Sequence, residues 1–219
     1  MRLWSDSFRD GGLMPADYAF AALDGARQVR PAANRNPHLA WDEVPAGTES
    51  LVLFCFDVDA PRDASGANRP GSRITVETAR RDFFHWSVID MPAAQGCLRA
   101  GQYSSSIVAR GKRGPGVGAI DGHGAGLRQG INDFGAWYAD DAAMAGEYYG
   151  YDGPSPPWND DRIHHYIFRL YALDVARLPL GPIFTGGQAR AAIHGHILDE
   201  AQLIAAYSLN PELAATLKT

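Results

Sequence analysis

Apolar residues along this chain concentrate in short runs, separated by proline and glycine, rather than recurring with a helical period. Residues 51–56, Leu-Val-Leu-Phe-Cys-Phe, are rich in β-forming side chains and predict a buried central strand that ends at Asp57. Residues 83–89 predict a second strand, stopped at Asp90-Met-Pro92, and residues 166–173 predict a third. The 24 glycines and 14 prolines are scattered, as is typical of a chain with many turns. The pattern predicts a mainly β fold.

Helical signals are few. Thr185 precedes residues 186–193 as an N-cap, which predicts one short helix. Residues 111–130 are glycine-rich and poor in apolar side chains, so we expect a loop there. The tail, residues 198–209, leaves two alternatives: its alanines favour a helix, and its place after a helix in a β-rich chain favours a strand.

Composition narrows the class of protein. The 219 residues contain no linker-like segment and no repeat, so we expect a single domain over residues 1–219. The net charge is −5, and the densest basic pair, Lys112 and Arg113, is too small for a nucleic-acid surface. The first eight residues lack the apolar segment of a secretory signal, and no apolar run approaches the about 20 residues that span a bilayer. We therefore expect a cytoplasmic protein with no nucleic-acid partner and no membrane insertion.

Candidate chemistry gathers at the strand ends. Side chains alternate between the two faces of a strand, so Asp57 and Asp59 share a face if the first strand continues through them. By the same parity His164 and Tyr166 share a face, and His165 points the other way. If the strands are neighbours, these side chains form one site; otherwise the aspartates are turn formers and the histidines are hydrogen-bonded core residues.

His85 lies in the middle of the second strand. Parity places it on the face of Phe83 and Ser87, opposite Phe84 and Trp86.

Two loops have a double interpretation. Residues 151–160 contain three prolines, so this stretch is either a rigid wall of a pocket delivered to His164 or a stiff connection. Residues 111–118 match neither the P-loop nor the dinucleotide fingerprint, which favours a flexible loop.

His194 and His196 lack an obvious third ligand, so we expect neither a metal nor a cofactor.

Taken in order, these segments resemble the phosphatidylethanolamine-binding proteins, in the bacterial branch described as Raf-kinase-inhibitor-like. The resemblance covers nearly the whole chain, and its ordered blocks are Asn36-Pro-His-Leu-Ala-Trp41, Asp57-Val-Asp-Ala-Pro61, His85-Trp-Ser-Val-Ile-Asp-Met-Pro92, Gly130-Ile-Asn-Asp-Phe-Gly135, Tyr151-Asp-Gly-Pro-Ser-Pro-Pro157, His164-His-Tyr166 with the strand that follows, and Gly195-His-Ile-Leu198.

The resemblance implies an antiparallel β core with a few peripheral short helices and a small pocket at the rim of the large sheet. It implies that the pocket accepts phosphate, phosphoryl head groups and similar small anions, and that the protein is a homodimer. The positions that match the family pocket are Asp57, Asp59, Pro61, His85, Pro156, Pro157, His164 and Tyr166.

The chain departs from the family pattern at several positions. Val58 replaces the signature proline, Ser155 stands where cysteine is frequent, and His165 stands where arginine is usual. Residues 136–149 form an inserted segment, aromatic and acidic, that shorter bacterial relatives lack. We expect this segment to line the pocket rim or a subunit interface.

A carboxylate in an anion site repels the bound anion unless a proton lies between the two charges or a nearby group is protonated. Either an aspartate holds a histidine as imidazolium, or a protonated phosphate donates to an aspartate while His85 and His164 donate to its other oxygens. Because histidine changes charge near pH 6.5, both arrangements predict that affinity falls as the pH rises above about 7.

The function that we expect is the binding of a small anionic or phosphorylated ligand, with a regulatory role as a kinase or protease inhibitor-like module whose partner the sequence does not name. The alternative is an enzyme that uses the Asp, His and Tyr side chains for acid–base or metal-assisted chemistry. An interaction protein with a vestigial pocket is a third alternative.

Overall fold

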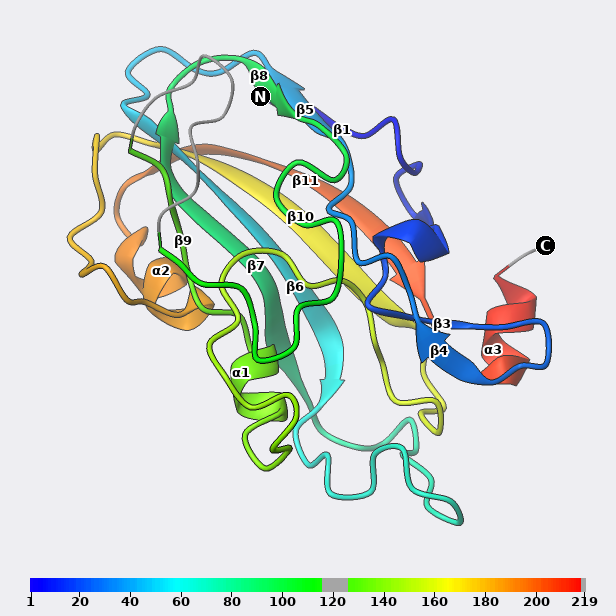
Figure 1. Ribbon diagram of the computed structural model, residues 1–219. Coiled ribbons are helices and arrows are strands. Elements are labelled where there is room, and N and C mark those ends of the chain that lie inside the picture. Colours follow the sequence, from blue (N-terminus) through cyan, green and yellow to red (C-terminus); the bar gives the residue numbers. More distant parts are fainter. Residues whose placement is uncertain (116–125, 218–219) are drawn as a thin grey trace.

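The computed structural model describes residues 1–115 and 126–217 of the chain. A six-stranded sheet forms its centre, with strand order β2-β11-β10-β6-β7-β9 (Figure 1). The long strands are β6 (Ser50–Pro61), β7 (Arg80–Pro92), β10 (His164–Leu173) and β11 (Ile197–Tyr207), and the short edge strands are β2 (Gly12–Leu13) and β9 (Arg128–Gln129). All neighbours are antiparallel except β2 and β11, which pair in parallel.

Smaller elements cover the two faces of this sheet. A three-stranded sheet of β1 (Arg2–Trp4), β5 (Leu39–Asp42) and β8 (Gly96–Leu98) packs on one face, where Trp41 meets Leu53 and Phe168 in the larger apolar cluster. On the other face Phe54 and Phe84 pack with Ile193, just after helix α2 (Gly186–Ala192). The strand alternation in β6 therefore feeds two separate cores, one on each side.

The remaining elements lie at the periphery (Figure 1). They are a 3-10 helix at Ala16–Tyr18, the hairpin of β3 (Ala21–Leu23) and β4 (Val29–Pro31), helix α1 (Phe134–Trp137) and helix α3 (Pro211–Thr216). No helix among the described residues is long and apolar enough to cross a bilayer.

The three predicted strands and the predicted helix are all present, and β6 lies in the middle of the sheet as expected. Thr185 caps α2, and it forms a capping box with Gln188. The predicted strands were too short. β6 continues past Asp57 to Pro61, because its backbone keeps pairing with β7 beyond the apolar run. The ambiguous tail is strand β11, because its backbone pairs with β10 on one side and, at Ala205 and Ala206, with β2 on the other.

The expected loop at residues 111–130 contains one short strand, β9. Residues 116–125, which include the end of the glycine-rich stretch, lie outside the described residues.

Candidate functional site

A small cavity opens where the C-terminal end of β6 meets the N-terminal parts of β7 and β10. Its volume is about 30 Å³, which leaves room for about two water-sized groups. Ten of its lining residues are buried, whereas Trp137 and Ser155 are partly exposed and mark the mouth. The lining residues are Asp57, Ala60, Pro61, Phe83, His85, Phe134, Trp137, Ser155, Pro156, Pro157, His164 and Tyr166.

The structure brings together seven of the eight residues that the sequence predicted for one pocket. Asp57, Pro61, His85, Pro156, Pro157, His164 and Tyr166 all line the cavity. The proline-rich stretch therefore forms a wall of the pocket rather than a remote connection.

Asp59 is the exception, and the expectation that it shares a face with Asp57 is wrong. A bulge between Asp57 and Ala60 shifts the register of β6 against β7, so Ala60 turns toward the cavity in place of Asp59. The carboxylate of Asp59 instead accepts hydrogen bonds from the backbone N–H and Nδ1 of His165, at 3.1 and 2.8 Å, and from Arg162 at 3.3 Å.

A second bulge places His85. Cys55 pairs with Trp86 and Phe56 with Phe84, so His85 is the extra residue of β7. His85 lines the cavity as predicted. The prediction that Trp86 shares a face with Phe84 is wrong, because the bulge places Trp86 in the apolar cluster of Cys55, whereas Phe84 belongs to the other cluster.

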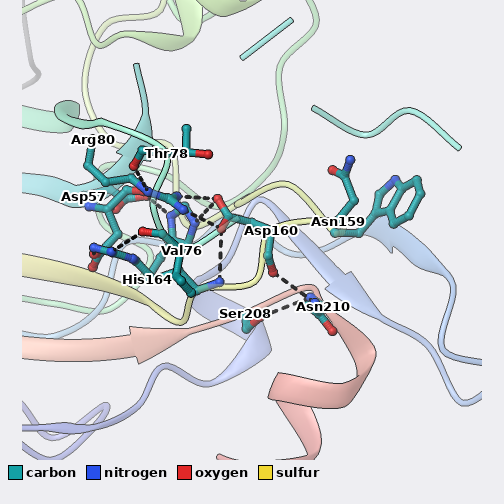
Figure 2. A network of polar contacts seen from close by, with 12 residues as sticks. Asp57, Val76, Thr78, Arg80, Asn159, Asp160, His164, Ser208 and Asn210 are labelled. Carbon is teal, nitrogen blue, oxygen red and sulfur yellow. Dashed lines mark hydrogen bonds and ion pairs between the residues drawn. The ribbon is translucent and has the colours of Figure 1, made fainter. Parts of the chain in front are cut away.

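His164 is held between two carboxylates (Figure 2). Its Nδ1 donates to Asp57 at 2.6 Å, and its Nε2 donates to Asp160 at 3.1 Å. Burial disfavours the imidazolium, but these two carboxylates outweigh burial and raise the pKa of His164 to about 9. His164 is therefore a cation at neutral pH, and both of its N–H groups are already engaged within the protein.

The two carboxylates are ionised in return. Burial opposes the ionisation of Asp57, yet the His164 imidazolium lowers the pKa of this carboxyl below its usual range. Asp160 shows the same balance, with Arg80 as a second cation: Arg80 donates from its two terminal nitrogens to Asp160, at 2.5 and 2.9 Å. The backbone carbonyl of Asp160 also accepts a hydrogen bond of 3.0 Å from Asn210, the N-cap of α3 (Figure 2).

Two polar groups in the cavity keep bonding capacity. The Nδ1 of His85 donates to the carbonyl oxygen of Asp152 at 2.7 Å, which leaves Nε2 for a ligand, and burial lowers the pKa of this histidine. The hydroxyl of Tyr166 is buried and lies beside the Asp57 carboxylate, but it forms no hydrogen bond of good geometry within the described part of the chain. Burial, with the Asp57 charge nearby, raises the pKa of the Tyr166 phenol, so it is a donor at neutral pH.

Sequence reasoning missed several residues of this site. Asp160 was named only as the end of the proline-rich loop, although its position four residues before His164 was a usable signal. Arg80 gave no signal, because it reaches Asp160 across 80 positions of the chain. Phe134 and Trp137 line the wall from α1, and Trp137 belongs to the inserted segment 136–149.

Across residues 1–115 and 126–217, no group of three or more His, Cys, Asp or Glu side chains is arranged to hold a metal ion. His196, one of the two histidines considered as metal ligands, forms a hydrogen bond with the carboxylate of Asp174 through Nδ1, at 2.9 Å.

Comparison with known sequences gives one consistent family. The family model described as phosphatidylethanolamine-binding protein matches residues 4–208. The UPF0098 protein YbhB of Escherichia coli is 31% identical over 210 residues, which cover 95% of this chain and 100% of that protein. A UPF0098 protein of Methanothermobacter thermautotrophicus is 31% identical over 207 residues, covering 94% and 98%.

Solved structures show the same fold. The crystal structure of Escherichia coli YbcL, described as a new member of the mammalian PEBP family, aligns with a TM-score of 0.63 at 23% identity and covers 94% of this chain and 97% of that one. The phosphatidylethanolamine-binding protein homolog CT736 of Chlamydia trachomatis aligns with a TM-score of 0.59 at 25% identity, covering 94% and 96%.

Proposed function

This chain belongs to the phosphatidylethanolamine-binding protein family, and from that premise we propose that its cavity binds a small, singly charged phosphoryl group, as free phosphate or as the head of a phosphomonoester. The observation that carries the proposal is a pair of polar groups in the cavity that the protein leaves without a well-formed hydrogen bond, the Tyr166 hydroxyl and His85 Nε2, whereas Asp57 and His164 are bonded to each other. A buried hydroxyl with no partner costs about 1–3 kcal/mol, and one with a poorly formed hydrogen bond costs part of that, which a bound phosphoryl oxygen would remove.

Charge balance favours the monoanion over the dianion. Asp57 and Asp160 are matched by His164 and Arg80, so the cluster offers the ligand no net positive charge. A phosphoryl dianion would meet the ionised Asp57 without compensation, and their repulsion is large in a buried site. A singly protonated group carries its own hydrogen, which Asp57 or His85 Nε2 accepts, while Tyr166 donates to another oxygen.

The pH dependence that we propose for the binding affinity follows from the protonation of the ligand. The second pKa of a phosphomonoester is about 6, so the monoanion that we propose to bind becomes scarce above that pH. The direction agrees with the expectation from the sequence, but the cause differs. His164 stays charged up to a pH of about 9 and its N–H groups are occupied, so it neither titrates near neutrality nor donates to the ligand.

Calorimetric titration tests the proposal. Phosphoethanolamine and inorganic phosphate are titrated into the wild type and Tyr166→Phe at pH 6 and pH 8, with His196→Gln as a surface control. We expect affinity for phosphoethanolamine to fall about tenfold or more between the two pH values. Tyr166→Phe lowers it by about tenfold at pH 6, the equivalent of one hydrogen bond to a charged group. Equal affinity at both pH values, or no binding to the folded wild type, contradicts the proposal.

Binding has more support than catalysis. Ser155 is the hydroxyl at the mouth of the cavity, and no histidine or carboxylate of the described residues forms a hydrogen bond with it, as activation of a nucleophile requires. A regulatory role toward a kinase or protease stays a prediction from the family resemblance.

A further inference from the structure

A second buried polar cluster lies behind the cavity, around the carboxylate of Asp152. The side chain of Asp152 is buried and accepts hydrogen bonds from three segments that are distant in the sequence. Asn34 donates at 2.7 Å and Lys112 at 2.6 Å to one oxygen, and Asn132 donates at 2.8 Å to the other. Lys112 supplies the cation that this buried carboxylate needs.

The backbone of Asp152 is paired with His85. Its carbonyl oxygen accepts from His85 Nδ1 at 2.7 Å, and its N–H donates to the carbonyl of His85 at 3.1 Å. A carbonyl oxygen only accepts, so it fixes the hydrogen of the neutral imidazole on Nδ1. The side-chain cluster holds Asp152, and Asp152 holds the ring of His85.

Lys112 reaches this position because its neighbours are glycines. A Cβ on Gly111 would lie 2.1 Å from the carbonyl oxygen of Glu147, and a Cβ on Gly114 would lie 2.3 Å from the ring of Tyr149. The backbone of Tyr149 also donates to the carbonyl of Lys112 at 3.1 Å. Residues 111–115 therefore lie closely against residues 147–149.

We infer that Lys112 and Asp152 are positioning residues that hold His85 with Nε2 turned toward the cavity. The inference stands on the Asp152 cluster itself, and only its consequence for phosphoryl affinity rests on the proposed function. Without the Lys112 ammonium the Asp152 carboxylate is buried without a cation, so both the orientation of His85 and its proton affinity change. The charged groups that act on His85 are the carboxylates of Asp57, Asp133 and Asp152, and the titratable phenol of Tyr166 packs against its ring with centroids 5.1 Å apart.

The test compares Lys112→Met with Lys112→Arg, and uses Arg113→Met as the matched control because Arg113 is exposed in the same segment. NMR of the imidazole nitrogens of His85 reports its tautomer and titration midpoint, and circular dichroism checks folding. We expect the Nδ1–H tautomer in the wild type, and a midpoint at higher pH with loss of the single tautomer in Lys112→Met. Lys112→Arg restores the wild-type behaviour at least in part, and Arg113→Met leaves it unchanged.

Asp152→Asn provides a second route if Lys112→Met does not fold. It keeps the backbone carbonyl and the shape of the side chain but removes the charge, so we expect the midpoint of His85 to move to lower pH. A folded Lys112→Met or Asp152→Asn protein whose His85 tautomer and midpoint equal those of the wild type overturns the inference.

Phosphoethanolamine titration of the same variants separates this inference from the proposed function. An affinity that falls about fivefold in Lys112→Met supports both. A wild type that does not bind, but whose His85 responds to Lys112→Met, contradicts the proposed function and leaves the positioning role intact. Binding by the wild type with an unresponsive His85 contradicts the positioning role alone.

Discussion

His164 shows how one residue links the site to the stability of the protein. In the folded chain its pKa is about 9, against 6.5 for an ordinary histidine, because Asp57 and Asp160 stabilise its charge more than burial opposes it. A group whose pKa is raised by folding contributes stability that is fully present below its unfolded pKa. That contribution is lost as the pH rises through the folded value.

We therefore expect the free energy of unfolding to decrease by about 3 kcal/mol between roughly pH 6 and pH 10 through this residue. Urea unfolding at several pH values measures it, and the comparison of wild type with His164→Gln isolates it. The glutamine variant loses this part of the pH dependence, whereas His196→Gln, at an exposed ion pair, keeps it. Identical pH slopes for the wild type and His164→Gln would show that the buried ion pairs do not set the proton affinity of His164.

At the scale of elements, helix α1 and the inserted segment form one aromatic unit. Phe134 stacks on Phe20 with ring centroids 4.7 Å apart and on Tyr138 at 5.8 Å, and Tyr148 completes the buried cluster. Deleting residues 136–149 would remove part of this apolar core, so the loss of folding would obscure any effect on binding. Trp137, partly exposed at the mouth, is the better position for a test.

We expect Trp137→Ala to reduce affinity for phosphoethanolamine about fivefold, because it removes one side of the apolar mouth and lets water reach the polar end of the cavity. Calorimetric titration measures this, and Trp4→Ala, at a 40% exposed tryptophan on β1, serves as the control. If Trp137→Ala changes the mass in solution and leaves affinity unchanged, the segment belongs to a subunit interface instead.

At the scale of the whole molecule, the homodimer implied by the family resemblance is a prediction that the mass in solution tests. Several large apolar side chains are exposed, among them Ile183 at 62% and Leu198 at 45%. Burying some of them in a subunit interface would stabilise a dimer. We expect a mass of about twice 23.7 kDa in light scattering at micromolar concentration. A mass of one chain over a tenfold concentration range would contradict the dimer.

The sequence alone determined the family, the mainly β fold, three of the four long strands and seven of the residues that line the cavity. It did so because alternation, proline and N-cap signals are local, and because ordered blocks of residues identify a family together. Strand register and bulges were decided only in three dimensions. The bulge after Asp57 separates Asp59 from the pocket, and the bulge at His85 places Trp86 in the other core, because pairing with a neighbouring strand overrides parity within one strand.

The pairing of charged side chains was likewise decided by the tertiary structure. Arg80 reaches Asp160, and Lys112 reaches Asp152, from segments 80 and 40 positions away, so no local pattern announces either pair. Burial then makes these contacts consequential, since a carboxylate removed from water must find a cation or hydrogen-bond donors within the fold. The residue types present at the site follow from the sequence, whereas their protonation states and the hydrogen-bonding atoms left available to a ligand follow from the packing around them.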